Sequence, residues 1–103
     1  MNLRGKQKRF LRARANHLQP LFAVGKEGLT ANWLAQLDGA LDRRELIKVN
    51  ILQNADVNTD EVKDFIEGQT DIQVVQTIGR VLALFKVSAN KDMRHLSDQV
   101  KKI

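Results

Sequence analysis

Cysteine is absent from this 103-residue chain, which excludes disulfide bonds, thiolate metal sites and thiol catalysis together. Aromatic residues make up only 5% of the sequence and hydrophobic residues 43%, so aliphatic side chains must form most of the core. No apolar run approaches the roughly 18 residues of a membrane-spanning helix. The basic N-terminus lacks the apolar segment of a signal peptide. We therefore expect a single compact domain in the cytoplasm, with no membrane contact.

Recognisable catalytic motifs are also missing. The two histidines, His17 and His95, belong to no visible group of nucleophile, base and orienting residue, and we interpret both as surface or interface residues. The sequence contains no P-loop, nucleophile elbow or zinc-ligand spacing. We predict no enzyme activity, no cofactor, no metal site and no small-molecule substrate.

The positive charge is concentrated at one end of the chain. The net charge is +5, yet the remaining 83 residues hold 11 basic and 12 acidic residues, so all of the excess lies in residues 1 to 20. This asymmetry favours a polyanionic partner, most simply a nucleic acid. A solubilising tail is the alternative, and an anionic membrane surface is disfavoured because only two bulky anchors, Phe10 and Leu11, lie nearby. The basic residues concerned are Arg4, Lys6, Lys8, Arg9, Arg12 and Arg14.

A short glycine-bounded segment, Gly25-Lys26-Glu27-Gly28, separates the apolar residues 21–24 from a helical pattern that opens at Thr30. Glycine has no Cβ, so the backbone of such a turn can approach a sugar-phosphate chain, and the following helix start directs unpaired N–H groups outward. KH domains clamp a single strand with a GXXG loop in this way. An ordinary strand-to-helix turn has the same pattern, so both interpretations stay open.

Hydrophobic periodicity predicts an α/β domain with the order α-β-α-β-α-β-β and a four-stranded mixed sheet. Helical connections make the first three strands parallel, and a hairpin at Gly79-Arg80 adds an antiparallel fourth. Residues 88–103 form a tail, which we expect to be a short amphipathic helix, after a domain spanning residues 1–87. The predicted helices are 3–18, one opening at Thr30, and 58–68, and the predicted strands are 21–24, 45–52, 72–78 and 81–87.

The expected faces of these elements limit the possible binding modes. The first helix presents an apolar face and a basic face. Phe22 and Phe85 fit core-facing positions, so the strands offer none of the exposed aromatics on which an RRM stacks bases. Trp33 is interpreted as a packing residue, and the acidic third helix is expected to face away from any nucleic acid. The apolar face of the first helix comprises Leu3, Phe10, Leu11 and Leu18.

Several segments in one order and spacing resemble the CRM domain (chloroplast RNA splicing and ribosome maturation), specifically its bacterial stand-alone YhbY type. The resemblance covers about residues 2 to 87. The sequence departs from the family pattern in two features: Glu27 puts a negative charge in the loop, and Leu84-Phe85-Lys86 replaces a Leu-Tyr-Arg ending. The matching segments are Lys6-Gln7-Lys8, Leu18-Gln19-Pro20, Val24 to Thr30, Glu45 to Val49, and Ile78-Gly79-Arg80 through Lys86.

The resemblance implies an RNA-binding fold similar to the C-terminal domain of translation initiation factor three, and association with precursors of the large ribosomal subunit. The leading hypothesis is therefore a non-catalytic RNA-binding factor in ribosome assembly. An architectural DNA-binding protein is the first alternative and an RNA-modifying enzyme the second. The implied RNA-binding residues are Lys6, Lys8, Arg9 and Arg12 on the helix and Gly25, Lys26, Glu27 and Gly28 in the loop.

Overall fold

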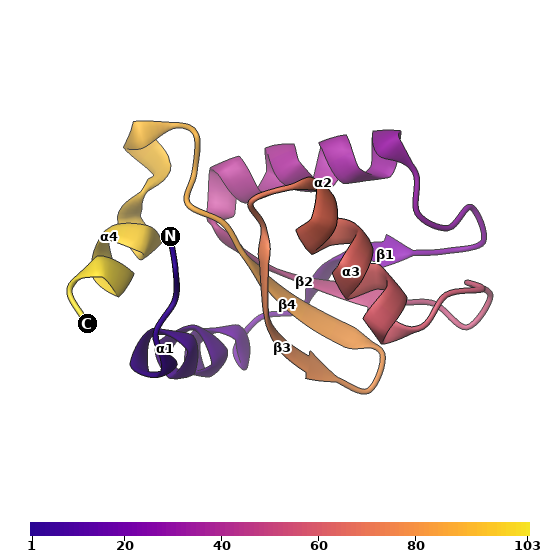
Figure 1. The fold of residues 1–103 in the computed structure, drawn as a ribbon, viewed down its shortest axis with the longest axis horizontal. Coiled ribbons are helices and arrows are strands. Elements are labelled where there is room, and N and C mark those ends of the chain that lie inside the picture. Colours follow the sequence, from indigo (N-terminus) through magenta and orange to yellow (C-terminus); the bar gives the residue numbers. More distant parts are fainter.

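A computed structural model describes all residues from 1 to 103 as a three-layered α/β domain, 40 × 25 × 23 Å in extent. Helices α2 and α3 cover one face of a four-stranded sheet, while α1 lies on the opposite face with α4 beside it (Figure 1). The elements are α1 (Gly5–Ala15), β1 (Pro20–Val24), α2 (Ala31–Arg44), β2 (Leu46–Ile51), α3 (Thr59–Gln69), β3 (Gln73–Ile78), β4 (Val81–Phe85), the 3-10 turn η1 (Lys91–Met93) and α4 (His95–Lys101).

The predicted element order and the mixed sheet are confirmed, and the lateral order of the strands adds a detail that the sequence left open. The strands lie in the order β1-β2-β4-β3, so the last strand of the sequence occupies an interior position. β1 and β2 pair in parallel, and β4 is antiparallel to both of its neighbours. The first three strands therefore share one direction, as predicted, although β3 never pairs with β2. β4 is apolar throughout, as expected of an interior strand, and its residues after Val81 are buried.

The first helix is shorter than predicted. It begins at Gly5 and ends at Ala15 instead of spanning residues 3–18, and Leu18 lies in the linker to β1 with 36% of its surface exposed. Three residues of the predicted apolar face are confirmed, since Leu11 is fully buried and Leu3 and Phe10 pack partly buried against the same cluster. The buried positions of the helix repeat every four residues. These buried residues are Gln7, Leu11 and Ala15.

The predicted starts of α2 and α3 are confirmed by their capping bonds. The Thr30 hydroxyl accepts the Trp33 backbone N–H at 3.0 Å, and the Asn58 side chain accepts the Glu61 N–H at 2.8 Å. The predicted end at Gly68 is wrong by about a residue, since α3 continues to Gln69 and the hydroxyl of Thr70 donates to the carbonyl of Ile66. Gly79 has the positive φ, 58°, that the hairpin turn requires.

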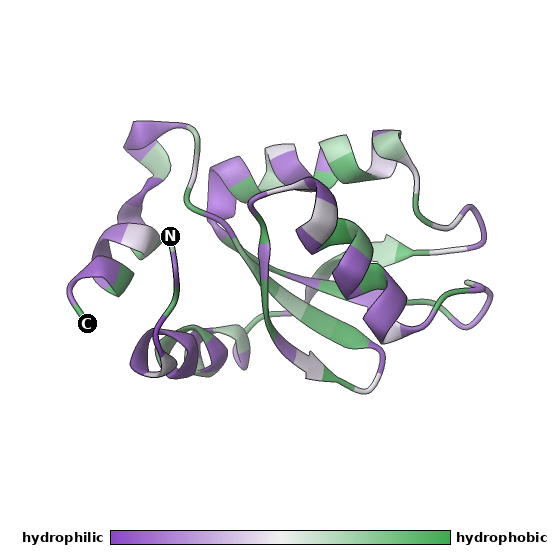
Figure 2. Ribbon diagram, viewed as in Figure 1, coloured by the Kyte–Doolittle hydropathy of each residue, from purple (hydrophilic) through white to green (hydrophobic).

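Two hydrophobic clusters lie on the two faces of the sheet. The larger cluster joins β1, β2 and β4 to α2 and α3, and Phe22 and Trp33 pack against its margin. The smaller cluster joins α1 and α4 to Leu46, Ala83 and Phe85 on the opposite face. Phe85 is 1% exposed, which confirms its predicted core position. Figure 2 shows the contrast between the hydrophobic central strand β4 and the predominantly hydrophilic α1. None of the helices combines the length and apolar composition needed to cross a membrane.

The C-terminal segment forms the expected short helix, which is anchored by buried polar groups. Val100 is fully buried in the smaller cluster, and the side-chain amide of Gln7 donates to its carbonyl at 3.1 Å. The buried carboxylate of Glu45 accepts the backbone N–H of Ser88 at 2.7 Å and that of Ser97 at 2.9 Å. Residues 88–103 are therefore packed onto the fold, and a boundary between a domain and a tail at residue 87 stays a prediction.

Lys86, one of the departures from the family pattern, forms a network with α2. Its Nζ lies 2.9 Å from Asp38 Oδ1 and 2.8 Å from Asp42 Oδ1. Burial alone would raise the pKa of Asp42, but hydrogen bonds from the Ala89 backbone and from Lys86 outweigh it and hold that pKa below its ordinary value. Burial alone would lower the pKa of Lys86, and the two carboxylates raise it instead. The Lys86 side chain thus ties the end of β4 to α2.

Candidate functional site

The segment Gly25 to Gly28 forms a tight turn in which the Gly28 N–H donates to the Gly25 carbonyl at 3.0 Å. Gly28 has a φ of 72°, a left-handed conformation that side chains other than glycine adopt with strain. Gly25 shows no such constraint, because an added Cβ would meet Leu52 Cδ1 at 3.6 Å, an ordinary contact distance. Backbone conformation therefore requires glycine at Gly28 alone.

The two ends of the turn are held by Trp33, whose role is wider than the packing that the sequence indicated. The Trp33 indole N–H donates to the Ala23 carbonyl at 2.9 Å, which ties the start of α2 to the end of β1. Lys26 and Glu27, at the tip, are exposed. The backbone N–H groups of Lys26, Glu27 and Leu29 donate no hydrogen bond within the protein. A rigidly held turn therefore presents unpaired donors at the start of a helix.

The basic residues predicted on the first helix are divided between two positions. Lys6 and Arg9 are exposed, whereas Lys8 and Arg12 line a hollow of about 200 Å³ against β3, together with Lys63. Arg12 also has a structural role, because its Nε donates to the Val75 carbonyl at 2.6 Å. Its terminal nitrogens form no hydrogen bond or ion pair within the protein, so one guanidinium can both hold α1 to the sheet and present charge.

The other two arginines of this region contact the C-terminal segment. Arg4 donates to the carbonyl of Ile103, and Arg14 donates to the Gln99 side chain at 3.4 Å while lying over the Phe10 ring. None of the basic residues of α1 pairs with a carboxylate, since the ion pairs of the protein are those of Lys86. The charge of α1 is thus not neutralised within the fold.

The structure does not gather the eight predicted residues into one cluster. In Figure 1 the turn of residues 25–28 lies at one end of the long axis, and α1 lies toward the opposite end, near both termini. The predicted site therefore consists of two separate parts, the turn and the basic helix. Part of the sheet, on the face where α1 packs, lies between them.

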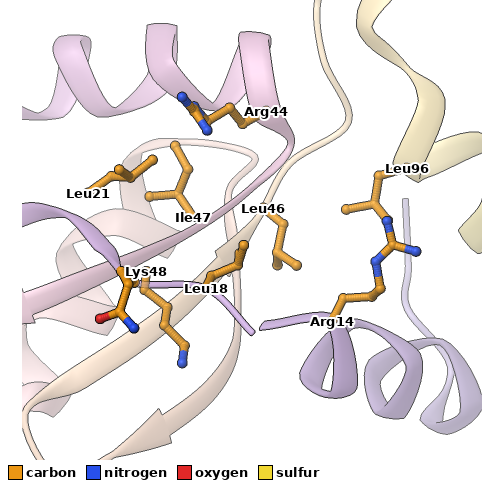
Figure 3. A pocket seen from close by; sticks show the side chains of 9 residues that line it. Arg14, Leu18, Leu21, Arg44, Leu46, Ile47, Lys48 and Leu96 are labelled. Atoms are coloured by element: carbon orange, nitrogen blue, oxygen red, sulfur yellow. The ribbon is translucent and has the colours of Figure 1, made fainter. Parts of the chain in front are cut away.

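That part of the sheet, which we call the open sheet face, is not covered by a helix. A hollow of about 310 Å³ lies on it, and a second of about 260 Å³ lies beside it at the start of β2, next to the last residue of α2 (Figure 3). The linker residues Leu18 and Gln19 and the β2 residue Lys48 line both hollows. The first is also lined by Asn16, Pro20, Gln76, Ile78, Val81 and Ala83, and the second by Arg14, Leu21, Arg44, Leu46, Ile47 and Leu96.

Acidic residues are segregated from these surfaces. The chain contains 12 Asp and Glu residues, yet none of them lies in α1 or in any of the four strands. The residues that line the hollow beside α1 and the two hollows of the open sheet face include no carboxylate. Four acidic residues lie on α3, which covers the opposite face of the sheet from α1, and the expectation that this helix faces away from a nucleic acid stays a prediction. Arg44 and Lys48 were not predicted as binding residues from the sequence. The signal that could have indicated this surface is the lack of acidic residues in segments 46–55 and 72–91.

Comparison with known families gives a match to the CRS1 / YhbY (CRM) domain over residues 3–86. The chain belongs to this family. The CRM match runs from just before α1 to the end of β4 and leaves α4 outside. No group of three or more side chains of the types that bind metal ions lies together in this CRM domain.

Relatives of this CRM domain occur in bacteria and in an archaeon. The chain is 48% identical over 86 residues to the "Probable RNA-binding protein YqeI" of Bacillus subtilis, covering 84% of this chain and 90% of the relative. It is 40% identical over 86 residues to the "Probable RNA-binding protein MJ0652" of Methanocaldococcus jannaschii, covering 82% and 63%. The solution structure of SAV1595 from Staphylococcus aureus superimposes with a TM-score of 0.71 at 38% identity, covering 87% of this chain and 94% of that one.

Proposed function

We propose that this protein is a non-catalytic RNA-binding factor that associates with precursors of the large ribosomal subunit. The observation that carries the proposal is the acid-free surface, on which basic side chains of α1 have no carboxylate partner. Such a surface attracts a polyanion, because each phosphate it neutralises releases a condensed counterion. The relatives named as probable RNA-binding proteins support RNA as this polyanion.

The turn of residues 25–28 supplies a second phosphate contact. The unpaired N–H groups of Lys26, Glu27 and Leu29 are available to phosphate oxygens, and the Lys26 ammonium adds charge at the tip of the turn. Glu27 opposes this contact, so we expect its carboxylate to weaken binding. Lys6, Lys8, Arg9 and Arg12 hold an adjacent part of the RNA electrostatically.

Two experiments test the proposal. The first measures binding of the purified chain to a structured ribosomal RNA fragment and to duplex DNA of equal length, by fluorescence anisotropy. Tighter binding to the RNA is expected, whereas equal affinity would favour an architectural DNA-binding protein. Turnover of the RNA by the purified chain would contradict the non-catalytic role.

The second experiment identifies the RNA in cells. The protein is crosslinked to RNA in growing cells and purified, and the bound RNA is sequenced. Enrichment of precursor large-subunit ribosomal RNA over mature ribosomal RNA is expected. Enrichment of messenger RNA or of no particular RNA would contradict the ribosomal role and leave a general RNA-binding function.

A further inference from the structure

We propose that the open sheet face binds unpaired nucleotides of the RNA, so that bases lie on the sheet while the turn and α1 hold the phosphates on either side. This inference rests on the proposed function and adds a third contact surface to it. It starts from the position of the open sheet face, which lies between the turn at residues 25–28 and the basic helix (Figure 1). A strand that contacted both of these parts would cross this surface.

The apolar part of the surface suits the faces of bases. Ile78, Leu21 and Leu18 are 63%, 54% and 36% exposed, and they are three of the six large hydrophobic residues that the fold leaves exposed. Ile78 lines the hollow on the open sheet face, Leu21 lines the hollow beside it at the start of β2, and Leu18 lines both. Burial of such side chains against a planar apolar group is favourable, and any of the four bases offers such a face.

The polar residues of the surface suit the edges and phosphates of nucleotides. The side-chain amides of Asn16, Gln19 and Gln76 line the first hollow, and amides can both donate to and accept from base edges. Lys48 lies at the junction of the two hollows, and Arg44 and Arg14 lie on opposite sides of the second (Figure 3). With no carboxylate among the lining residues, the charge complements a polyanion and gives no partner to a basic protein segment.

The same observations favour unpaired nucleotides over a duplex. In a double helix the base faces are stacked and the Watson–Crick edges are paired, so a duplex would contact the surface through its backbone alone. Exposed leucine and isoleucine side chains contribute nothing to such a contact. An internal loop or single-stranded segment can place its bases on them.

The test compares two RNA probes of equal length, a perfect hairpin and the same hairpin with an internal loop of unpaired uridines. The variants are Leu21→Ser combined with Ile78→Ser, and Lys48→Gln. Because both apolar side chains are largely exposed, the double variant is expected to fold, which circular dichroism checks. Met93→Ser is the matched control, since Met93 is 40% exposed and lines none of these hollows.

We expect the double variant to bind the looped probe about five- to ten-fold more weakly, and the perfect hairpin within about two-fold of the unmodified protein. Lys48→Gln should weaken binding to the looped probe about three- to ten-fold and make its salt dependence shallower by about 0.7. Met93→Ser should bind both probes normally. Equal binding of the looped probe by all variants would overturn the inference, whereas failure of the unmodified protein to bind either probe would overturn the proposed function instead.

Photocrosslinking with 4-thiouridine in the internal loop gives a second readout. Crosslinked peptides that contain residues 18–21, 48 or 76–78 are expected. Crosslinks confined to α1 and residues 25–28 would contradict base binding on the sheet. If the double variant instead converts a self-associated form to monomer in sedimentation, with RNA binding unchanged, the open sheet face is an interface between copies and the inference is wrong.

Discussion

The carboxylate of Glu45 accepts the backbone N–H of Ser97 at 2.9 Å, across 52 residues of sequence. Glu45 ends α2 in a left-handed conformation, with a φ of 62°, and its side chain is completely buried. Since Ser97 lies in the first turn of α4, the carboxylate caps that helix from another part of the fold. The second oxygen accepts the Ser88 N–H at 2.7 Å, so a single side chain holds both ends of the connection to α4.

Replacing Glu45 should therefore loosen the C-terminal segment. Glu45→Ala leaves two buried N–H groups without an acceptor, and we expect a loss of about 3 kcal/mol in the free energy of unfolding. Glu45→Gln, which keeps one acceptor oxygen, should lose less. Urea denaturation measures both, with Asp64→Ala on the exposed face of α3 as a control expected within about 0.5 kcal/mol of the unmodified protein. A loss below about 1 kcal/mol for Glu45→Ala would contradict the capping role.

The Lys86 network predicts a pH dependence of stability. The pKa of Asp42 is lowered in the folded state, so its contribution is present above about 3.9, the ordinary aspartate value, and is lost as pH falls through the native pKa. The pKa of Lys86 is raised, so its contribution is lost only as pH rises through the native pKa, above about 10.4. The urea midpoints of the unmodified protein and of Lys86→Met should therefore become equal at the lowest and at the highest pH. A constant difference from pH 2.5 to 11 would show that the network contributes through packing rather than charge.

The two glycines of the turn should respond differently to alanine. Gly25→Ala meets only an ordinary contact with Leu52, so the fold should keep its stability, and any loss of RNA binding reports on phosphate approach to the turn. Gly28→Ala forces a side chain into a left-handed conformation and should cost about 1 kcal/mol of stability. Thermal unfolding and anisotropy are measured on both. Unchanged RNA binding by folded Gly25→Ala would show that residues 25–28 form a structural turn with no contact to phosphate.

Neutralising Glu27 should strengthen RNA binding. Its exposed carboxylate lies at the tip of the turn, and removal of a repulsion worth about 0.5 to 1 kcal/mol corresponds to roughly two- to five-fold tighter binding by Glu27→Gln. The gain should shrink as salt rises. Asp64→Asn is the matched control, because Asp64 is exposed on α3, across the sheet from α1. Equal gains by both variants would mean that the turn does not contact the RNA.

Salt dependence should report on the basic helix. If about four of the six basic residues of α1 and its N-cap contact phosphates, the logarithm of the binding constant should fall against the logarithm of salt concentration with a slope of roughly −3 to −4. Lys6→Gln combined with Arg9→Gln removes two exposed charges that form no bond within the protein, and should make the slope shallower by about 1.5 to 2. Titrations at four salt concentrations measure it. A slope near zero would show that the N-terminal basic residues do not contact phosphates and serve only to keep the protein soluble.

Local sequence patterns were sufficient to predict the helices and strands of the fold. They were insufficient to predict the contacts between residues that are distant in the sequence. Alternation identified β2, and cap residues identified the starts of α2 and α3, because those signals lie within a few residues. The burial of Glu45 has no such signal, since its partners lie 43 and 52 residues away. Periodicity gives no lateral order either, although the unbroken apolar run of β4 is typical of an interior strand.

The same distinction applies to the candidate site. The turn and the basic helix were visible as local motifs, and their roles stay predictions. The open sheet face combines Lys48 with residues of β3 and β4 that lie about thirty positions later, so only the sheet topology brings them together. Its one sequence signal is negative, the lack of acidic residues in the segments that supply strands.

The interior position of β4 sets the order in which this chain can fold during its own synthesis. Until Val81–Phe85 have emerged from the ribosome, β2 has only β1 beside it, and β3 has no hydrogen-bonded neighbour. A nascent chain that stops before residue 81 therefore leaves unpaired the edges of β2 and β3 that β4 covers in the finished sheet, and its core is incomplete, which favours aggregation. Completion of the sheet should thus wait for the synthesis of residues 81–85, and fragments released earlier should be degraded or aggregate rather than bind RNA.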